Sequence, residues 1–119
     1  MWQVDYTDEF EIWWNGLSES RQIDIDASVQ LLEKLGINLP FPHTSKIANS
    51  KHSHMRELRV QSKGTPIRIL YAFDPKRHAI LLIGGDKTGD RCWYEKNVPI
   101  ADQLYDEHLK EINEENKNV

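Results

Sequence analysis

Three basic side chains lie on or just after three successive strand-like segments in the middle of the chain. They are Arg59, Arg68 and Lys87. Cations on adjoining strands of one sheet would form a fixed electropositive floor, and an unpaired cation is costly unless it faces water or an anion. A guanidinium group matches the geometry of a phosphate and stays protonated at neutral pH. The pattern therefore favours an anion-binding site.

Strand geometry limits which basic residues can share this floor. Successive side chains of a strand point to opposite faces, so Arg56 and Arg59 face opposite ways if their strand is regular. We expect Arg59 to join Arg68, which points outward while its apolar neighbours on either side point into the core. The alternatives are structural: Arg68 could form a salt bridge to Glu57 or Asp86, and Arg59 could pair with the acidic helices.

Composition places these residues in one domain spanning residues 1–119. The chain is 39% hydrophobic and 29% charged, which is ordinary for a globular protein. We find neither a signal peptide nor an apolar run of about 18 residues in the sequence, so we expect a cytoplasmic protein with no membrane partner. The single cysteine excludes an internal disulfide, and the five histidines lack metal-site spacing. We expect no metal and no cofactor.

Charge is distributed unevenly along the sequence, whose net charge is −4. Residues 1–40 hold two basic and eight acidic side chains (−6), residues 41–96 hold eleven and five (+6), and residues 97–119 hold two and six (−4). A basic middle between acidic ends predicts one positive face. The alternative is a solvated surface on which basic residues happen to cluster.

The segments that flank the basic region predict a strand and a helix hairpin. Residues 2–6 alternate as a strand, and helical spacing predicts two antiparallel helices, from Thr7 or Asp8 to Gly16 and from Ser18 to Gly36. The apolar stripe of the second helix is expected to be Ile23, Ala27, Leu31 and Leu35, flanked by Ile25, Val29 and Leu32. The tryptophans Trp2, Trp13 and Trp14 are expected in the core or on a surface that faces a protein partner.

The second half of the chain predicts a meander and a final helix. Residues 38–53 read as an irregular connection. Period-two patterns at 56–61, 67–73 and 78–83 predict an antiparallel meander that completes a four-stranded sheet. A third helix is expected from Pro99, with a frayed tail over 114–119. The predicted fold class is α+β.

This order of elements resembles the toxins of the bacterial RelE/ParE superfamily. The HigB-type, phage Gp49-like branch is similar in four segments: Glu57-Leu58-Arg59, Arg68-Ile69-Leu70-Tyr71-Ala72-Phe73-Asp74-Pro75, Gly84-Gly85-Asp86-Lys87-Thr88-Gly89, and Ala101-Asp102 through Tyr105-Asp106-Glu107-His108-Leu109. The resemblance covers nearly the whole chain and implies a RelE-like fold.

The resemblance also implies a function and partners. It implies the toxin of a type II toxin–antitoxin system, a metal-independent messenger-RNA endoribonuclease that inhibits translation. The 2′-hydroxyl of the RNA would attack the adjacent phosphate. The implied partners are messenger RNA, the ribosome and a co-encoded HigA-type helix-turn-helix antitoxin. The alternative is a ParE-like inhibitor of DNA gyrase or a catalytically silent antitoxin-binding module.

The resemblance assigns the catalytic residues, and the types and positions of other polar residues suggest proton carriers and RNA contacts. The predicted catalytic residues are Arg59, Arg68, Lys87 and Tyr94. Lys87 could instead lie in a polar turn, and Tyr94 or its neighbour Trp93 could belong to the core. His52 and His54 titrate near neutrality and are candidate proton carriers, or are simply solvated. The predicted RNA contacts are Lys46, Lys51, His54, Arg56 and Arg91.

Overall fold

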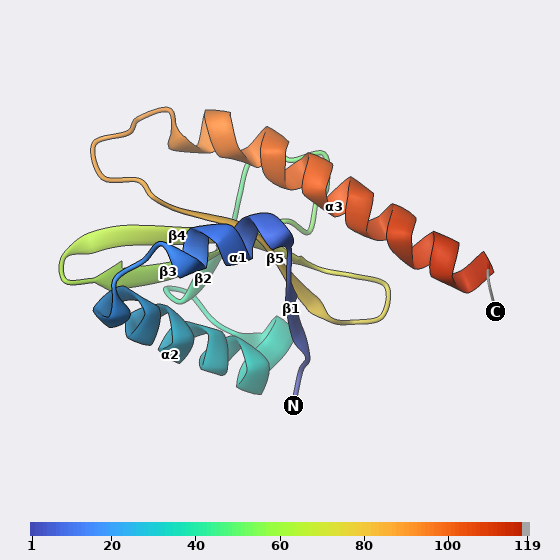
Figure 1. The fold of residues 1–119 in the computed structure, drawn as a ribbon, viewed down its shortest axis with the longest axis horizontal. Coiled ribbons are helices and arrows are strands. Elements are labelled where there is room, and N and C mark those ends of the chain that lie inside the picture. Colours follow the sequence, from blue (N-terminus) through green and yellow to red (C-terminus); the bar gives the residue numbers. More distant parts are fainter. Residues whose placement is uncertain (118–119) are drawn as a thin grey trace.

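The computed structural model describes residues 1–117, which form a five-stranded sheet covered by helices on both faces (Figure 1). In chain order the elements are β1 (Val4–Tyr6), α1 (Asp8–Asn15), α2 (Glu19–Leu35), the 3-10 turn η1 (Gly36–Asn38), β2 (Thr44–Lys46), β3 (Arg56–Ser62), β4 (Thr65–Phe73), β5 (Ala79–Asp86) and α3 (Trp93–Lys117). The strand order is β1-β5-β4-β3-β2. β1 runs parallel to β5, and all other neighbours are antiparallel. The predicted α+β class and meander are confirmed.

The helix hairpin begins and ends where its capping residues predict. The hydroxyl groups of Thr7 and Ser18 accept hydrogen bonds from the first turns of α1 and α2, and Gly36 ends α2 with a φ of 55°. The expected stripe of α2 is partly wrong, because Ile23 is 61% exposed while Ile25 and Leu32 are fully buried. At about 100° per residue, Ile23 lies about 200° around the helix from Ile25, so both cannot face β3.

The sheet has one strand more than expected. Thr44–Lys46 pairs antiparallel with residues 56–58 as β2, so the connection 38–53 is not wholly irregular and the four-stranded prediction is wrong. A three-residue Thr-Ser-Lys segment carries no alternating apolar signal, and its pairing is decided by tertiary contact. β5 also extends to Asp86, three residues beyond the predicted end, because Gly84 and Gly85 continue the ladder without apolar side chains.

The C-terminal helix begins six residues earlier than predicted. It starts at Trp93, and Pro99 lies inside it. The Asp90 carboxylate accepts a hydrogen bond from the backbone N–H of Cys92 at 2.9 Å, and Trp93 and Val98 are buried. Proline favours the first turn of a helix, which is why the sequence predicts a start at Pro99. Burial of Trp93 and Val98 accounts for the additional helix before the proline. The helix continues to Lys117, so the expected frayed tail is helical up to there, and residues 118–119 lie outside the described part.

Two apolar clusters lie on opposite faces of the sheet. Ile67, Ile69 and Tyr71 of β4 pack with α1 and α2, whereas Leu70 and Ala72 pack with α3. By the same alternation, Arg68 belongs to the face that α3 covers. None of the helices within residues 1–117 combines the length and apolar character needed to cross a bilayer.

Candidate active site

A buried carboxylate, Glu57, lies at the centre of the predicted basic residues. It is 5% exposed, and its Oε1 lies 3.0 Å from Nε of Arg68 and accepts a hydrogen bond from the Tyr94 hydroxyl at 2.6 Å. Its Oε2 accepts a hydrogen bond from the Ser45 hydroxyl at 2.8 Å and lies 4.0 Å from Nη1 of Arg59. We call Ser45, Glu57, Arg59, Arg68, Lys87 and Tyr94 the Glu57 cluster. Strands β2, β3 and β4 and the start of α3 all contribute to it.

Arg68 is more enclosed than predicted. It lies on the face opposite Ile67 and Ile69, as expected, but it is 6% exposed and therefore buried beside Glu57 rather than open to water. One guanidinium nitrogen, Nη1, donates to the carbonyl of Ile67 at 3.0 Å. Nε is within ion-pair distance of Glu57 but is not aligned with it, and within residues 1–117 it has no hydrogen-bond partner. This contact is the Glu57 ion pair expected under the structural alternative for Arg68, and charge rather than an aligned hydrogen bond holds the guanidinium group against the carboxylate.

The two arginines lie directly side by side. Arg59 of β3 is the register partner of Arg68 of β4. Like charges opposite each other destabilise a sheet, and Glu57 offsets only one of the two charges. Arg56 faces the other way and donates from Nε to the hydroxyl of Thr44 at 3.2 Å, on the α2 side. The predicted parity of this strand is confirmed.

Lys87 adds a third cation beside the tyrosine. Its Nζ lies 5.2 Å from the ring centroid of Tyr94. Burial, followed by the charge of Arg68, lowers the pKa of Lys87, although Glu57 opposes this shift. Burial and then the hydrogen bond to Glu57 raise the pKa of Tyr94. Tyr94 therefore stays a neutral donor at physiological pH, and Lys87 releases a proton more readily than an ordinary lysine.

A glycine brings the start of α3 against this part of the sheet. Gly85 pairs with Arg68 in the β4–β5 register, and a Cβ atom added to it would lie 2.6 Å from Nε1 of Trp93. Trp93 is 4% exposed, so the indole fills the space that Gly85 leaves open. This close approach fixes the position of the next residue, Tyr94, over Glu57.

The predicted proton carriers His52 and His54 have other partners. His52 pairs with Asp106 of α3 at 2.8 Å, and His54 shares a hydrogen bond with the Tyr105 hydroxyl at 3.1 Å. Lys51, a predicted RNA contact, also pairs with Asp106, at 2.7 Å. The structure therefore uses this loop to hold α3, and none of these hydrogen bonds reaches Glu57.

The remaining predicted RNA contacts are spread over two regions. Lys46 and Arg56 are register partners on the α2 side of the sheet and line a cavity of about 330 Å³ together with His54. Arg91 is exposed in the turn before α3. The structure thus separates Lys46 and Arg56 from the Glu57 cluster by the thickness of the sheet, whereas His54 lines the same cavity and also contacts Tyr105 of α3.

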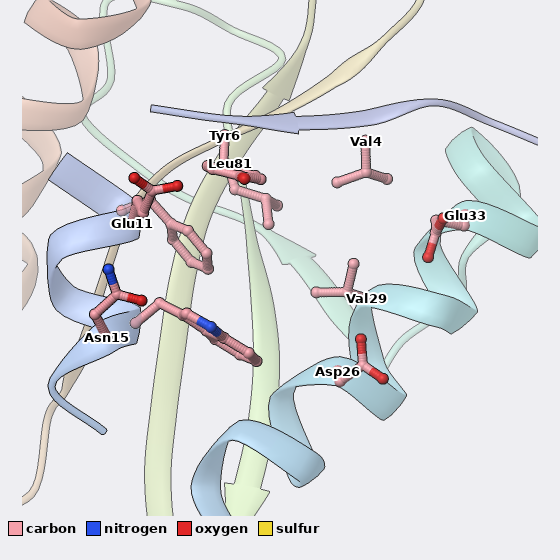
Figure 2. A pocket seen from close by; sticks show the side chains of 10 residues that line it. Val4, Tyr6, Glu11, Asn15, Asp26, Val29, Glu33 and Leu81 are labelled. Carbon is pink, nitrogen blue, oxygen red and sulfur yellow. The ribbon is translucent and has the colours of Figure 1, made fainter. Parts of the chain in front are cut away.

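A second cavity, of about 350 Å³, lies between α1 and α2 over β1 (Figure 2). Phe10, Trp14 and Val29 supply apolar walls, and Trp14, which packs against the core cluster as expected, also lines this cavity. The carboxylates that line it are those of Glu11, Asp26 and Glu33. Negative charge at this cavity disfavours a phosphate, so we do not place RNA chemistry there.

One group of side chains has the spacing of a possible cation site. Asp5, Asp74 and His78 bring their ligand atoms within 4.8 Å of one another. Each is engaged in hydrogen bonds: His78 Nδ1 lies 3.1 Å from Asp5, and Asp74 accepts from the backbone N–H of His78 at 3.0 Å and pairs with His108 at 2.8 Å. These bonds tie β1 and α3 to the β4–β5 turn, which accounts for the group as a structural one.

Glu57 and Ser45 are the members of the cluster that the sequence did not assign to the site. The sequence indicates Glu57 only as an ion-pair partner for Arg68. Its position two residues before Arg59 places both side chains on one face of β3, and that spacing is the signal that could have identified it. Ser45 had no such signal, because β2 itself was not predicted.

Comparison with known proteins supports the resemblance. Residues 12–106 match the family model described as phage derived protein Gp49-like (DUF891). A Mycobacterium tuberculosis (strain ATCC 25618 / H37Rv) protein named "Putative toxin HigB3" is 45% identical over 96 residues, which cover 80% of this chain and 82% of that protein. "Putative toxin HigB2" of the same strain is 36% identical over 113 residues, which cover 93% of this chain but 56% of the relative.

A solved structure shows the same fold. The crystal structure of the intact E. coli RelBE toxin–antitoxin complex contains a chain that matches with a TM-score of 0.53 and 7% sequence identity, over 71% of this chain and 95% of that one. At this identity the match concerns the fold alone. The chain belongs to the phage Gp49-like family and is a homologue of HigB toxins with a RelE-like fold.

Proposed function

We propose that this protein is the toxin of a toxin–antitoxin system and that it cleaves messenger RNA at the Glu57 cluster, thereby inhibiting translation. The observation that carries the proposal is the pairing of two guanidinium groups: the buried Arg68 is the register partner of Arg59, and the single carboxylate of Glu57 lies beside both. A phosphate placed against Arg59 and Arg68 would accept hydrogen bonds from their guanidinium N–H groups and reduce the repulsion between the two cations.

The cluster contains the groups that such a cleavage requires. The 2′-oxygen of the RNA attacks the adjacent phosphorus while its proton passes to the carboxylate of Glu57. Arg59 and Arg68 stabilise the negative charge that develops on the non-bridging oxygens. The bond from phosphorus to the 5′-oxygen breaks, and the leaving oxygen takes a proton from the ammonium group of Lys87. The products are a 2′,3′-cyclic phosphate and a 5′-hydroxyl.

Tyr94 holds this arrangement in place. Its hydroxyl donates to Glu57 at 2.6 Å, and its ring lies against Lys87. It therefore orients the proposed base and the proposed acid at the same time. Because its pKa is raised, it keeps this role across the physiological range.

We propose that the protein acts with a co-encoded HigA-type antitoxin, and on messages at the ribosome. An acidic antitoxin segment would complement the basic middle of the chain and would cover the Glu57 cluster. The other proposed RNA contacts, Lys46, Lys51, His54, Arg56 and Arg91, would lie on flanking RNA or on the ribosome, with Lys51 first having to leave its pair with Asp106.

Expression in a bacterial host tests the proposal. We expect induction to arrest growth and fragment messenger RNA, and we expect the Arg68→Ala variant to relieve both effects. Arg77→Ala is the matched control, because Arg77 is exposed and lies in the β4–β5 turn, over the Trp2 ring. Intact messages accompanied by DNA damage would instead indicate a gyrase inhibitor, and absence of toxicity would indicate a silent binding module.

A further inference from the structure

An exposed aromatic ring lies beside the proposed phosphate site. Phe41 is 71% exposed, and the guanidinium carbon of Arg59 lies 5.5 Å from the centroid of its ring. A single exposed apolar residue is common on a protein surface, so the informative feature of Phe41 is its contact with a cation of the Glu57 cluster. Within residues 1–117, the only cation over this ring is Arg59, a member of the Glu57 cluster.

The turn that carries Phe41 is fastened to the sheet next to the cluster. The backbone N–H of Arg59 donates to the carbonyl of His43 at 2.9 Å, and the N–H of His43 donates to the carbonyl of Pro40 at 3.0 Å. These bonds join the turn to β3 at the position of Arg59 itself. The turn that carries the ring is therefore anchored beside Arg59.

A second ring and cation occupy another position around Glu57. Lys87 lies 5.2 Å from the centroid of the Tyr94 ring, and Tyr94 donates to Glu57. Two aromatic–cation pairs therefore lie near the carboxylate of Glu57: Tyr94 with Lys87 at the start of α3, and Phe41 with Arg59. A nucleic-acid strand offers the matching order of groups, because its phosphate is flanked by two bases, each with a flat π-face.

We propose that Phe41 is a stacking platform for an unpaired nucleobase next to the phosphate that Arg59 and Arg68 bind. This inference rests on the proposed function and extends it, because it names the residue that would contact a nucleobase beside the bound phosphate. A base in a duplex already stacks on its neighbours, whereas an unpaired base is free to lie on Phe41. Stacking accepts every base, so the platform would add affinity with little sequence preference.

The test measures binding of a single-stranded RNA oligonucleotide in which 2′-deoxy substitution prevents cleavage. Fluorescence anisotropy would compare the unmodified protein with Phe41→Ala, Phe41→Trp and the control Ile12→Ala, since Ile12 is an apolar residue of α1 that is 74% exposed. We expect Phe41→Ala to weaken binding roughly 5- to 150-fold, Phe41→Trp to retain it and Ile12→Ala to leave it unchanged.

An abasic scan separates stacking from an indirect effect through Arg59. Replacing one nucleotide at a time by an abasic residue should reveal one position at which Phe41→Ala no longer matters. Equal affinity of Phe41→Ala and the unmodified protein would overturn the proposal, and so would a loss that no abasic position cancels. Failure of the proposed function looks different: binding and cleavage of unmodified RNA would be absent or insensitive to Arg68→Ala.

Discussion

Glu57 places a negative charge where the substrate would also be negative. Its carboxylate is 5% exposed and shares the site with Arg59, Arg68 and Lys87, so one anion stands among three cations. In an empty site it limits the repulsion between the arginines. In the proposed reaction it accepts a proton and becomes neutral as charge develops on the phosphate. One residue can therefore serve both stability and catalysis.

The first prediction concerns this carboxylate. Glu57→Gln preserves the size of the side chain and an acceptor for Tyr94, but it removes the proposed base. We expect the single-turnover cleavage rate to fall about 10²- to 10⁴-fold, while RNA binds more tightly because a negative charge is lost. The exposed residue Glu95 of α3 provides the control Glu95→Gln. A rate that stays within a few fold of the unmodified protein would show that another group is the base.

The second prediction concerns the pH dependence set by Lys87. The proposed proton donor must be protonated, and its pKa lies below the ordinary lysine value of 10.5 because of burial and the charge of Arg68. The single-turnover rate should therefore decline as pH rises through this lowered pKa, at a lower pH than an ordinary lysine would give. Lys87→Arg should remove this alkaline decline. An identical pH profile for the two proteins would contradict the assignment.

At the scale of the elements, a small side chain on β5 positions a helix. The start of α3 rests on Gly85, whose neighbour Trp93 occupies the space of a missing Cβ. We expect Gly85→Ala to displace Trp93 and with it Tyr94, which lowers the cleavage rate more than it lowers RNA affinity. The control is Gly64→Ala, where an added Cβ meets no atom within 4 Å although φ is 80°. Equal cleavage rates for Gly85→Ala and the unmodified protein would exclude this positioning role.

The loop before β3 depends on a buried carboxylate of α3. Asp102 is 4% exposed and accepts hydrogen bonds from the Ser50 hydroxyl and from the backbone N–H of Lys51. Asp102→Ala leaves these donors without their acceptor, and we expect it to lower the free energy of unfolding by about 1–3 kcal/mol. Hydrogen exchange should quicken most at residues 50–54, beyond the general increase that the lower free energy of unfolding causes. Asp26→Ala on α2, which is exposed, is the control, and equal losses in the two variants would contradict the prediction.

At the scale of the whole molecule, His–Asp pairs join distant parts of the chain. Burial alone would raise the pKa of Asp74, but its hydrogen bonds to His108 and to the backbone of His78 lower it on balance below 3.8. Because the pKa of Asp74 is lower in the folded protein than in the unfolded chain, its contribution to the free energy of unfolding is complete above the unfolded-state pKa. That contribution is lost as pH falls through the folded-state pKa. We therefore expect the free energy of unfolding to fall below about pH 4, and Asp74→Asn to flatten that decline. An unchanged slope would show that Asp74 does not govern it.

The sequence predicted the parts of this fold that rest on local signals. Thr7, Ser18 and Gly36 mark helix ends through their own side chains or backbone freedom, and the alternation around Arg68 placed it on the correct face. The sequence did not predict β2, the start of α3 before Pro99 or the depth of Arg68. The first two depend on pairing with β3 and on burial of Trp93, which are tertiary contacts that no local pattern encodes. The depth of Arg68 follows from its ion pair with Glu57, which the sequence offered only as an alternative.

The most direct measurement identifies the ends of the RNA that the purified protein produces from a defined single-stranded RNA. Attack by the 2′-hydroxyl predicts a 2′,3′-cyclic phosphate and a 5′-hydroxyl, formed equally well in the presence of a metal chelator and lost in Arg68→Ala. A thermal unfolding curve of Arg68→Ala would establish that the variant is folded. Products with a 5′-phosphate, or cleavage that persists unchanged in a folded Arg68→Ala protein, would contradict the account.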